Sequence, residues 1–125
     1  PEAFLAGIPI GLLIAAVVYM NEFPDHDSDK ATGKNTLIVV LGPEKARLGY
    51  VALVTSAFIS IIILAFNGTF PKLSLIALIA IYFGFTATRT LYKYYNSRLL
   101  QPANWGTIIM HSLTGILFCI GIWNG

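Results

Sequence analysis

Four long apolar stretches constrain this sequence more than any other feature. They run near residues 4–20, 48–66, 73–95 and 105–123. Each has the length, roughly 17 to 25 residues, that an α-helix needs to cross the hydrocarbon core of a bilayer. The stretches are too long for barrel strands and lack their period-2 alternation. The sequence therefore predicts an all-α fold, a polytopic transmembrane helical bundle.

Composition supports this class and excludes others. The chain is 56% hydrophobic and only 11% charged, whereas charged residues make up roughly 25% of ordinary soluble proteins. A net charge of +2, with no Lys/Arg run interleaved with aromatics, argues against a nucleic-acid partner. The single cysteine, Cys119, cannot form an internal disulfide. Because the chain begins at Pro1, without a methionine or a signal peptide, we expect it to be part of a longer protein.

The basic residues predict the orientation of the bundle. They gather in or beside the first and third loops, and Lys72 alone borders the second. The members of the two clusters are Lys30, Lys34, Lys45 and Arg47, then Arg89, Lys93 and Arg98. By the positive-inside rule, the first and third loops lie on the cytoplasmic side.

The first loop concentrates acidic residues, and its segment 21–36 reads NEFPDHDSDKATGKNT. On a helix, Asp25 and Asp29 would lie one turn apart on one side, whereas Asp27 would point elsewhere. Carboxylates of this kind suit Mg²⁺, which takes one or two carboxylates and completes its shell with water and substrate phosphates. Lys30 and Lys34 follow one and two turns on, where cations could neutralise a diphosphate.

Spacing alone leaves a plainer alternative open. The segment could be a solvated loop in which Pro24 opens a short helix and nearby aspartates complement its dipole. An EF-hand is excluded, because Lys30 stands where its loop needs glycine and Thr36 where it needs glutamate.

The segment 21–42 resembles the second aspartate-rich motif of the UbiA superfamily of intramembrane prenyltransferases, most of all in its menaquinone-type branch. That motif has the form N-x-x-x-D-x-x-x-D, followed by D-K/R-x-x-G-K-x-T-L and a short run ending in L-G. The matching residues are Asn21, Asp25, Asp29, Lys30, Gly33, Lys34, Thr36, Leu37, Leu41 and Gly42.

The resemblance implies both a fold and an activity. Residues 1–125 would be the C-terminal part of one prenyltransferase domain, the last four of nine transmembrane helices. The enzyme would transfer a polyprenyl group from a polyprenyl diphosphate to an aromatic acceptor, 1,4-dihydroxy-2-naphthoate, with Mg²⁺ as cofactor. Asp25 and Asp29 would hold the metal, with Asp27 as a lesser candidate. Asn21, Lys30 and Lys34 would contact the diphosphate.

The resemblance also implies that this chain carries only half of the active site. The family has a first aspartate-rich motif earlier in the chain, which these 125 residues lack. We therefore expect the isolated chain to be inactive and to need the N-terminal helices that carry this motif. We expect an integral protein of a prokaryotic inner membrane, with the acidic loop cytoplasmic. Hydroxybenzoate, homogentisate, glycerophosphate and haem acceptors stay open.

Three further residues are weaker candidates. His111 lies inside the fourth apolar stretch, where an ionisable residue is costly. It could contact the acceptor or simply bind a neighbouring helix. Arg89 and Lys93 could reach the diphosphate or anchor the third helix at the interface.

The competing function is a non-enzymatic membrane protein whose acidic loop binds cations or docks a partner.

Overall fold

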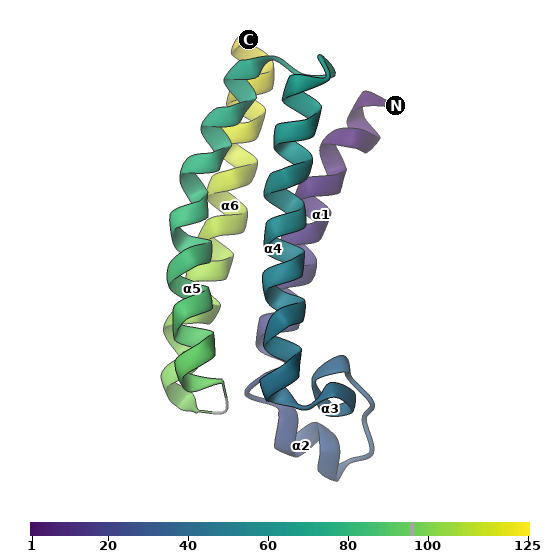
Figure 1. The fold of residues 1–125 in the computed structure, drawn as a ribbon, viewed down its shortest axis with the longest axis vertical. Coiled ribbons are helices and arrows are strands. Elements are labelled where there is room, and N and C mark those ends of the chain that lie inside the picture. Colours follow the sequence, from purple (N-terminus) through teal and green to yellow (C-terminus); the bar gives the residue numbers. More distant parts are fainter. Residues whose placement is uncertain (96) are drawn as a thin grey trace.

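The computed structural model describes residues 1–95 and 97–125, which form a bundle of helices (Figure 1). Two long helices are α1, Glu2–Asn21, and α4, Pro43–Phe66. The third long segment begins as a 3₁₀ helix, η1, Lys72–Ala80, and continues as α5, Ile81–Tyr94. A short 3₁₀ turn, η2, Arg98–Leu100, leads into α6, Gln101–Asn124.

Two short helices connect α1 to α4. They are α2, His26–Ala31, and α3, Leu37–Leu41. The described residues contain no strand, so the predicted all-α fold is confirmed. All four long segments are long and apolar enough to cross a membrane, and the chain is an integral membrane protein.

The predicted spans are confirmed, although two begin earlier than hydropathy indicated. Helix α4 starts at Pro43 rather than near residue 48, and α6 starts at Gln101 rather than near residue 105. Proline is favoured in the first helical turn because its missing N–H is not needed there. Pro43 and Pro102 occupy that turn in the two helices, so both helices extend beyond the apolar stretch.

The connections separate into two groups (Figure 1). Both termini lie at one end of the bundle, together with the connection from α4 to η1. The acidic segment with α2 and α3 lies at the other end, as does the connection from α5 to α6. The two basic loops therefore share one end, as the charge pattern predicted.

Helices α1 and α4 approach closely because Gly49 has no side chain. A Cβ at this position would overlap the ring of Tyr19. The Tyr19 hydroxyl donates a hydrogen bond of 2.7 Å to the carbonyl of Ala46, a buried contact between the two helices. Hydrogen bonds of this kind help membrane helices associate where no hydrophobic effect drives them together.

Small residues also allow the third segment to pack on α6. The buried residues of η1 are Ser74, Ala77 and Ala80, which are spaced by three. In a 3₁₀ helix, residues three apart lie directly above one another, so these small side chains form one thin ridge. Gly121 of α6 packs on it so tightly that a Cβ would overlap the backbone of Ser74.

Candidate functional site

The acidic segment is built from a turn and a short helix. The chain leaves α1 through hydrogen bonds of the i to i−3 type, including Glu22 N to Tyr19 O at 3.2 Å. Pro24 lies in this turn, and Asp25 is the N-cap residue of α2. Asn21 therefore ends one helix while Asp25 opens another, so the two do not lie on one continuous helix.

Asp25 and Asp29 lie one helical turn apart. The Asp29 N–H donates a hydrogen bond of 2.8 Å to the Asp25 carbonyl, which fixes this separation. The Asp29 side chain is 13% exposed and lies 3.8 Å from the ammonium of Lys34. Asp25 is exposed. Of this pair, Asp25 is thus solvated, and Asp29 already has a cation beside it.

Asp27 behaves differently from the two flanking aspartates. Its side chain is fully exposed, and its Oδ1 lies 2.9 Å from His26 Nδ1. This hydrogen bond joins sequence neighbours only. The structure therefore pairs Asp27 with His26, and Asp29 with Lys34.

The remaining predicted site residues are solvated. Asn21 and Lys30 are exposed. Lys34 is held by its backbone, because its N–H donates a 2.8 Å bond to the Asp29 carbonyl. Its side chain is 69% exposed, so the ammonium can still approach a ligand.

At two positions of the motif, the backbone conformation explains why the residue is glycine. Gly33 has φ of 77° and Gly42 has φ of 83°, conformations that L side chains rarely adopt. Gly33 ends the turn after α2, and Gly42 joins α3 to α4. Between them, Thr36 accepts a hydrogen bond of 3.3 Å from the Val39 N–H and so caps α3.

Two carboxylates suit a metal that the protein only partly ligates. Within the described part of the chain, no three His, Cys, Asp or Glu side chains form a group that could hold a metal ion. Mg²⁺ is commonly bound by one or two carboxylates together with substrate phosphates. The donor set of Asp25 and Asp29 fits that mode and does not form a complete all-protein cage.

Arg47 ties the acidic end of the bundle to the third loop. Its Nη1 donates a hydrogen bond of 2.9 Å to the carbonyl of Tyr92, near the end of α5. The guanidinium lies 4.4 Å from the ring centroid of Tyr92 and 4.9 Å from that of Tyr95. Its Nε also donates to the Glu44 carbonyl at 2.9 Å. The sequence indicated only a loop charge here, because these partners are distant in the chain.

Replacing Arg47 by lysine is expected to destabilise the protein although the charge is kept. An ammonium lacks the planar fork that donates from Nε and Nη1 while stacking on tyrosine rings. We expect a loss of about 1–3 kcal/mol, measured by thermal unfolding in detergent. Arg98→Lys, at an exposed arginine outside this contact, is the control. Equal stability of the two variants would contradict the role given to Arg47.

Three polar atoms of α6 are buried without a hydrogen-bond partner in the described residues. They are Oδ1 of Asn104, Nε2 of His111 and Oγ1 of Thr114. Asn104 and His111 are two turns apart, on the side of α6 where Gly115 lies near Ile10 of α1. Sequence reasoning singled out His111 by its charge but missed Asn104, because an asparagine near the end of a span has no distinctive pattern.

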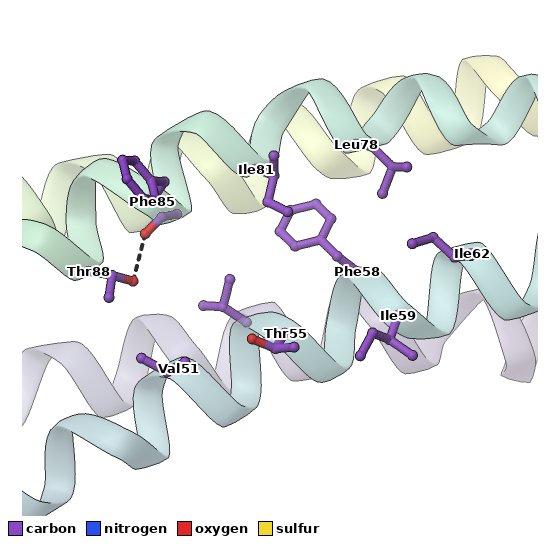
Figure 2. Close-up of a pocket in the computed structure, with 11 residues that line it drawn as sticks. Val51, Thr55, Phe58, Ile59, Ile62, Leu78, Ile81, Phe85 and Thr88 are labelled. Carbon is purple, nitrogen blue, oxygen red and sulfur yellow. Dashed lines mark hydrogen bonds between the residues drawn. The ribbon is translucent and has the colours of Figure 1, made fainter.

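An apolar cavity of about 490 Å³ lies away from the aspartates, between α4 and the third segment (Figure 2). Figure 2 shows Phe58 reaching from α4 toward Ile81, with Val51 and Thr88 at one end and Ile62 and Leu78 at the other. No ionisable side chain lines the cavity. It can therefore accept an apolar chain but cannot hold a metal.

The sequence matches that of a known class of membrane enzymes. Residues 1–113 match the model of the UbiA prenyltransferase family, and the chain belongs to that family. It is also 31% identical over 125 residues to a protein of Escherichia coli (strain K12) named 1,4-dihydroxy-2-naphthoate octaprenyltransferase. The match covers 98% of this chain but 40% of that relative. No solved structure matches the chain.

Proposed function

We propose that this chain is the C-terminal part of a Mg²⁺-dependent prenyltransferase. The enzyme transfers a polyprenyl group from a polyprenyl diphosphate to an aromatic acceptor, 1,4-dihydroxy-2-naphthoate. The name of the bacterial relative supports this acceptor. The observation that carries the proposal is the pair Asp25 and Asp29, one turn apart at a membrane boundary, with Lys34 beside the second.

The residues of the acidic segment have distinct roles in this reaction. Asp25 and Asp29 hold Mg²⁺, which when bound offsets the charge on the diphosphate leaving group. Lys30 and Lys34 add positive charge where that negative charge develops, and Asn21 supports the site as a polar neighbour. Asp27 contributes least, since it is paired with His26.

The membrane setting gives each part of the donor a matching environment. The diphosphate stays at the boundary with the aspartates, on the cytoplasmic side that the basic loops indicate. The prenyl tail needs an apolar space, such as the cavity between α4 and the third segment. The bond from the allylic carbon to diphosphate breaks and a ring carbon of the acceptor forms the new bond. That ring carbon then loses the group it carried, a proton from a C–H position or carbon dioxide from the position that bears the carboxylate.

The other half of the site belongs to the rest of the protein. Since the chain spans 40% of its relative, we propose that the missing N-terminal helices supply the first aspartate-rich motif. We expect the isolated chain to show no transfer, because two carboxylates cannot assemble the complete site. Measurable turnover by the 125 residues alone would refute this.

Removing divalent metal from the full-length protein is the direct test. Transfer of a radiolabelled polyprenyl diphosphate to 1,4-dihydroxy-2-naphthoate is expected to stop in EDTA and to return on addition of Mg²⁺. The same assay with 4-hydroxybenzoate measures acceptor choice, and we expect naphthoate to be preferred. Transfer that persists in EDTA would overturn the metal role. Absence of transfer to every aromatic acceptor would overturn the function.

A further inference from the structure

The last two turns of α5 carry a polar patch that the proposed function does not use. Five residues line a hollow of about 320 Å³ there, which is large enough for a small ligand. They are Thr86, Arg89, Thr90, Lys93 and Tyr94. We call this surface the α5 patch.

The α5 patch faces away from the rest of the described bundle. The buried residues of α5 are Gly84, Ala87 and Leu91. A Cβ on Gly84 would meet Met110 of α6 and Val54 of α4, so this side packs on both neighbours. By helical periodicity, Arg89 and Lys93 lie on the opposite side, toward the surroundings of the helix.

The α5 patch has positive charge without a protein counter-ion. Arg89 and Lys93 are one turn apart and exposed, and neither pairs with a carboxylate of the described residues. Both cations lie near aromatic rings: Arg89 is 5.9 Å from the centroid of the Phe85 ring, and Lys93 is 5.2 Å from that of the Tyr94 ring. Two cations in one hollow, without a carboxylate of the described residues beside them, favour binding of an anion with several oxygens.

The threonines shape the hollow and do not supply donors. Thr86 donates its hydroxyl proton to the Phe83 carbonyl at 3.0 Å, and Thr90 donates to the Thr86 carbonyl at 3.1 Å. Their short side chains leave space between the long side chains of Arg89, Lys93 and Tyr94. The donors left for a ligand are the two cations and the Tyr94 hydroxyl.

Toward the centre of the membrane, the same side of α5 becomes apolar. Tyr82 and Phe85 are 64% and 63% exposed. Tyr82 lies seven residues before Arg89, on the same side of the helix. An anionic head bound at the cations would therefore have its apolar tail along exposed aromatic surface, which is the profile of an amphiphile.

The diphosphate of the prenyl donor is not the partner that this placement favours. The acidic segment packs on α4 through α3, whereas the α5 patch faces away from α4. A diphosphate held by Asp25 and Asp29 would lie on another side of the bundle. A membrane lipid is an amphiphile that can approach the outward side of α5.

We propose that the α5 patch is a binding site for one anionic phospholipid. Its phosphate binds Arg89 and Lys93, and its acyl chains lie along the outward side of α5 at Tyr82. Basic residues at a membrane boundary attract anionic headgroups, each by a modest amount, and here a hollow adds a fixed position. The site is independent of the transferase reaction, so the two proposals can fail separately.

Native mass spectrometry of the delipidated full-length protein tests the site, with phosphatidylglycerol and phosphatidylcholine as probes. The parent protein is expected to retain one phosphatidylglycerol in preference to phosphatidylcholine. In the double variant Arg89→Gln, Lys93→Gln, the affinity for phosphatidylglycerol is expected to fall about twenty-fivefold, because each charge contributes about fivefold. If the double variant does not fold, Lys93→Gln alone is expected to show the fivefold loss.

The matched control removes the same charge at the same end of the bundle. Lys45 and Arg98 are exposed and lie outside the hollow, and the variant Lys45→Gln, Arg98→Gln is expected to keep the preference for phosphatidylglycerol. An equal loss in this control would overturn the site, because the effect would then be general charge attraction. Displacement of the retained lipid by one equivalent of geranylgeranyl diphosphate would overturn the choice of ligand. No preference in the parent would overturn the proposal outright.

Discussion

Replacing Asp25 by asparagine in the full-length protein is expected to lower kcat/KM for prenyl transfer at least about a hundredfold, and Asp29→Asn likewise. Metal coordination contributes several kcal/mol of charge stabilisation in the transition state, and each 1.4 kcal/mol is a factor of ten in rate. An amide keeps the size of the side chain but loses the negative charge that holds Mg²⁺. The measurement is steady-state transfer to 1,4-dihydroxy-2-naphthoate at several Mg²⁺ concentrations.

Asp27→Asn is the matched comparison for these two variants. It makes the same chemical change on the same short helix, but Asp27 is fully exposed and bonded to its neighbour His26. We expect a loss of less than about tenfold, because Asp27 lies two residues from each of the other two and therefore points to another side of the short helix. Equal losses at all three aspartates would contradict the division of roles. Full activity in Asp25→Asn and Asp29→Asn would instead support the alternative that the segment is a solvated loop without a metal role.

Gly121→Ala is expected to cause the largest loss of stability among single methyl additions to α6. Its Cβ would overlap the Ser74 backbone and lie 2.7 Å from the Leu73 carbonyl oxygen. Backbone cannot rotate away as a side chain can, so α6 and η1 must separate. Overpacking of this kind costs about 1–3 kcal/mol, and thermal unfolding of the full-length protein in detergent measures it.

Gly115→Ala gives the control for the packing effect. It adds the same methyl to the same helix, but its nearest neighbour, Cδ1 of Ile10, is 3.9 Å away, an ordinary contact. We expect this variant to unfold at nearly the parent temperature. A Gly121→Ala protein as stable as Gly115→Ala would show that η1 can move away from α6 at little cost.

The four spans could be predicted because the bilayer imposes a length that hydropathy reveals directly. Where the helices begin could not be predicted from hydropathy, since Pro43 and Pro102 belong to helices but lie outside the apolar stretches. The 3₁₀ conformation of η1 was also not predicted. Ser74, Ala77 and Ala80 are spaced as in an amphipathic α-helix, and only the contact with Gly121 indicates the closer packing.

The acidic segment was predicted more closely than its surroundings. Asp25 and Asp29 were expected one turn apart, and the helix α2 places them so, because that spacing depends on local hydrogen bonds alone. The contact of Arg47 with Tyr92 and Tyr95 depends on residues far apart in the chain, and no local pattern reveals it. The metal and substrate roles stay predictions, and the activity measurements on the aspartate variants test them.

The 3₁₀ conformation of η1 changes the distance that the third segment covers. A 3₁₀ helix rises about 2.0 Å per residue and an α-helix 1.5 Å, so Lys72–Ala80 extends about 18 Å where an α-helix would extend about 13.5 Å. Residues 81–88 add about 12 Å, which completes the roughly 30 Å of hydrocarbon. Counted from Lys72, the segment would thus cross the bilayer with fewer residues, and about its last turn and a half would lie beyond the hydrocarbon. Arg89, the next residue, is where the outward side of α5 becomes cationic.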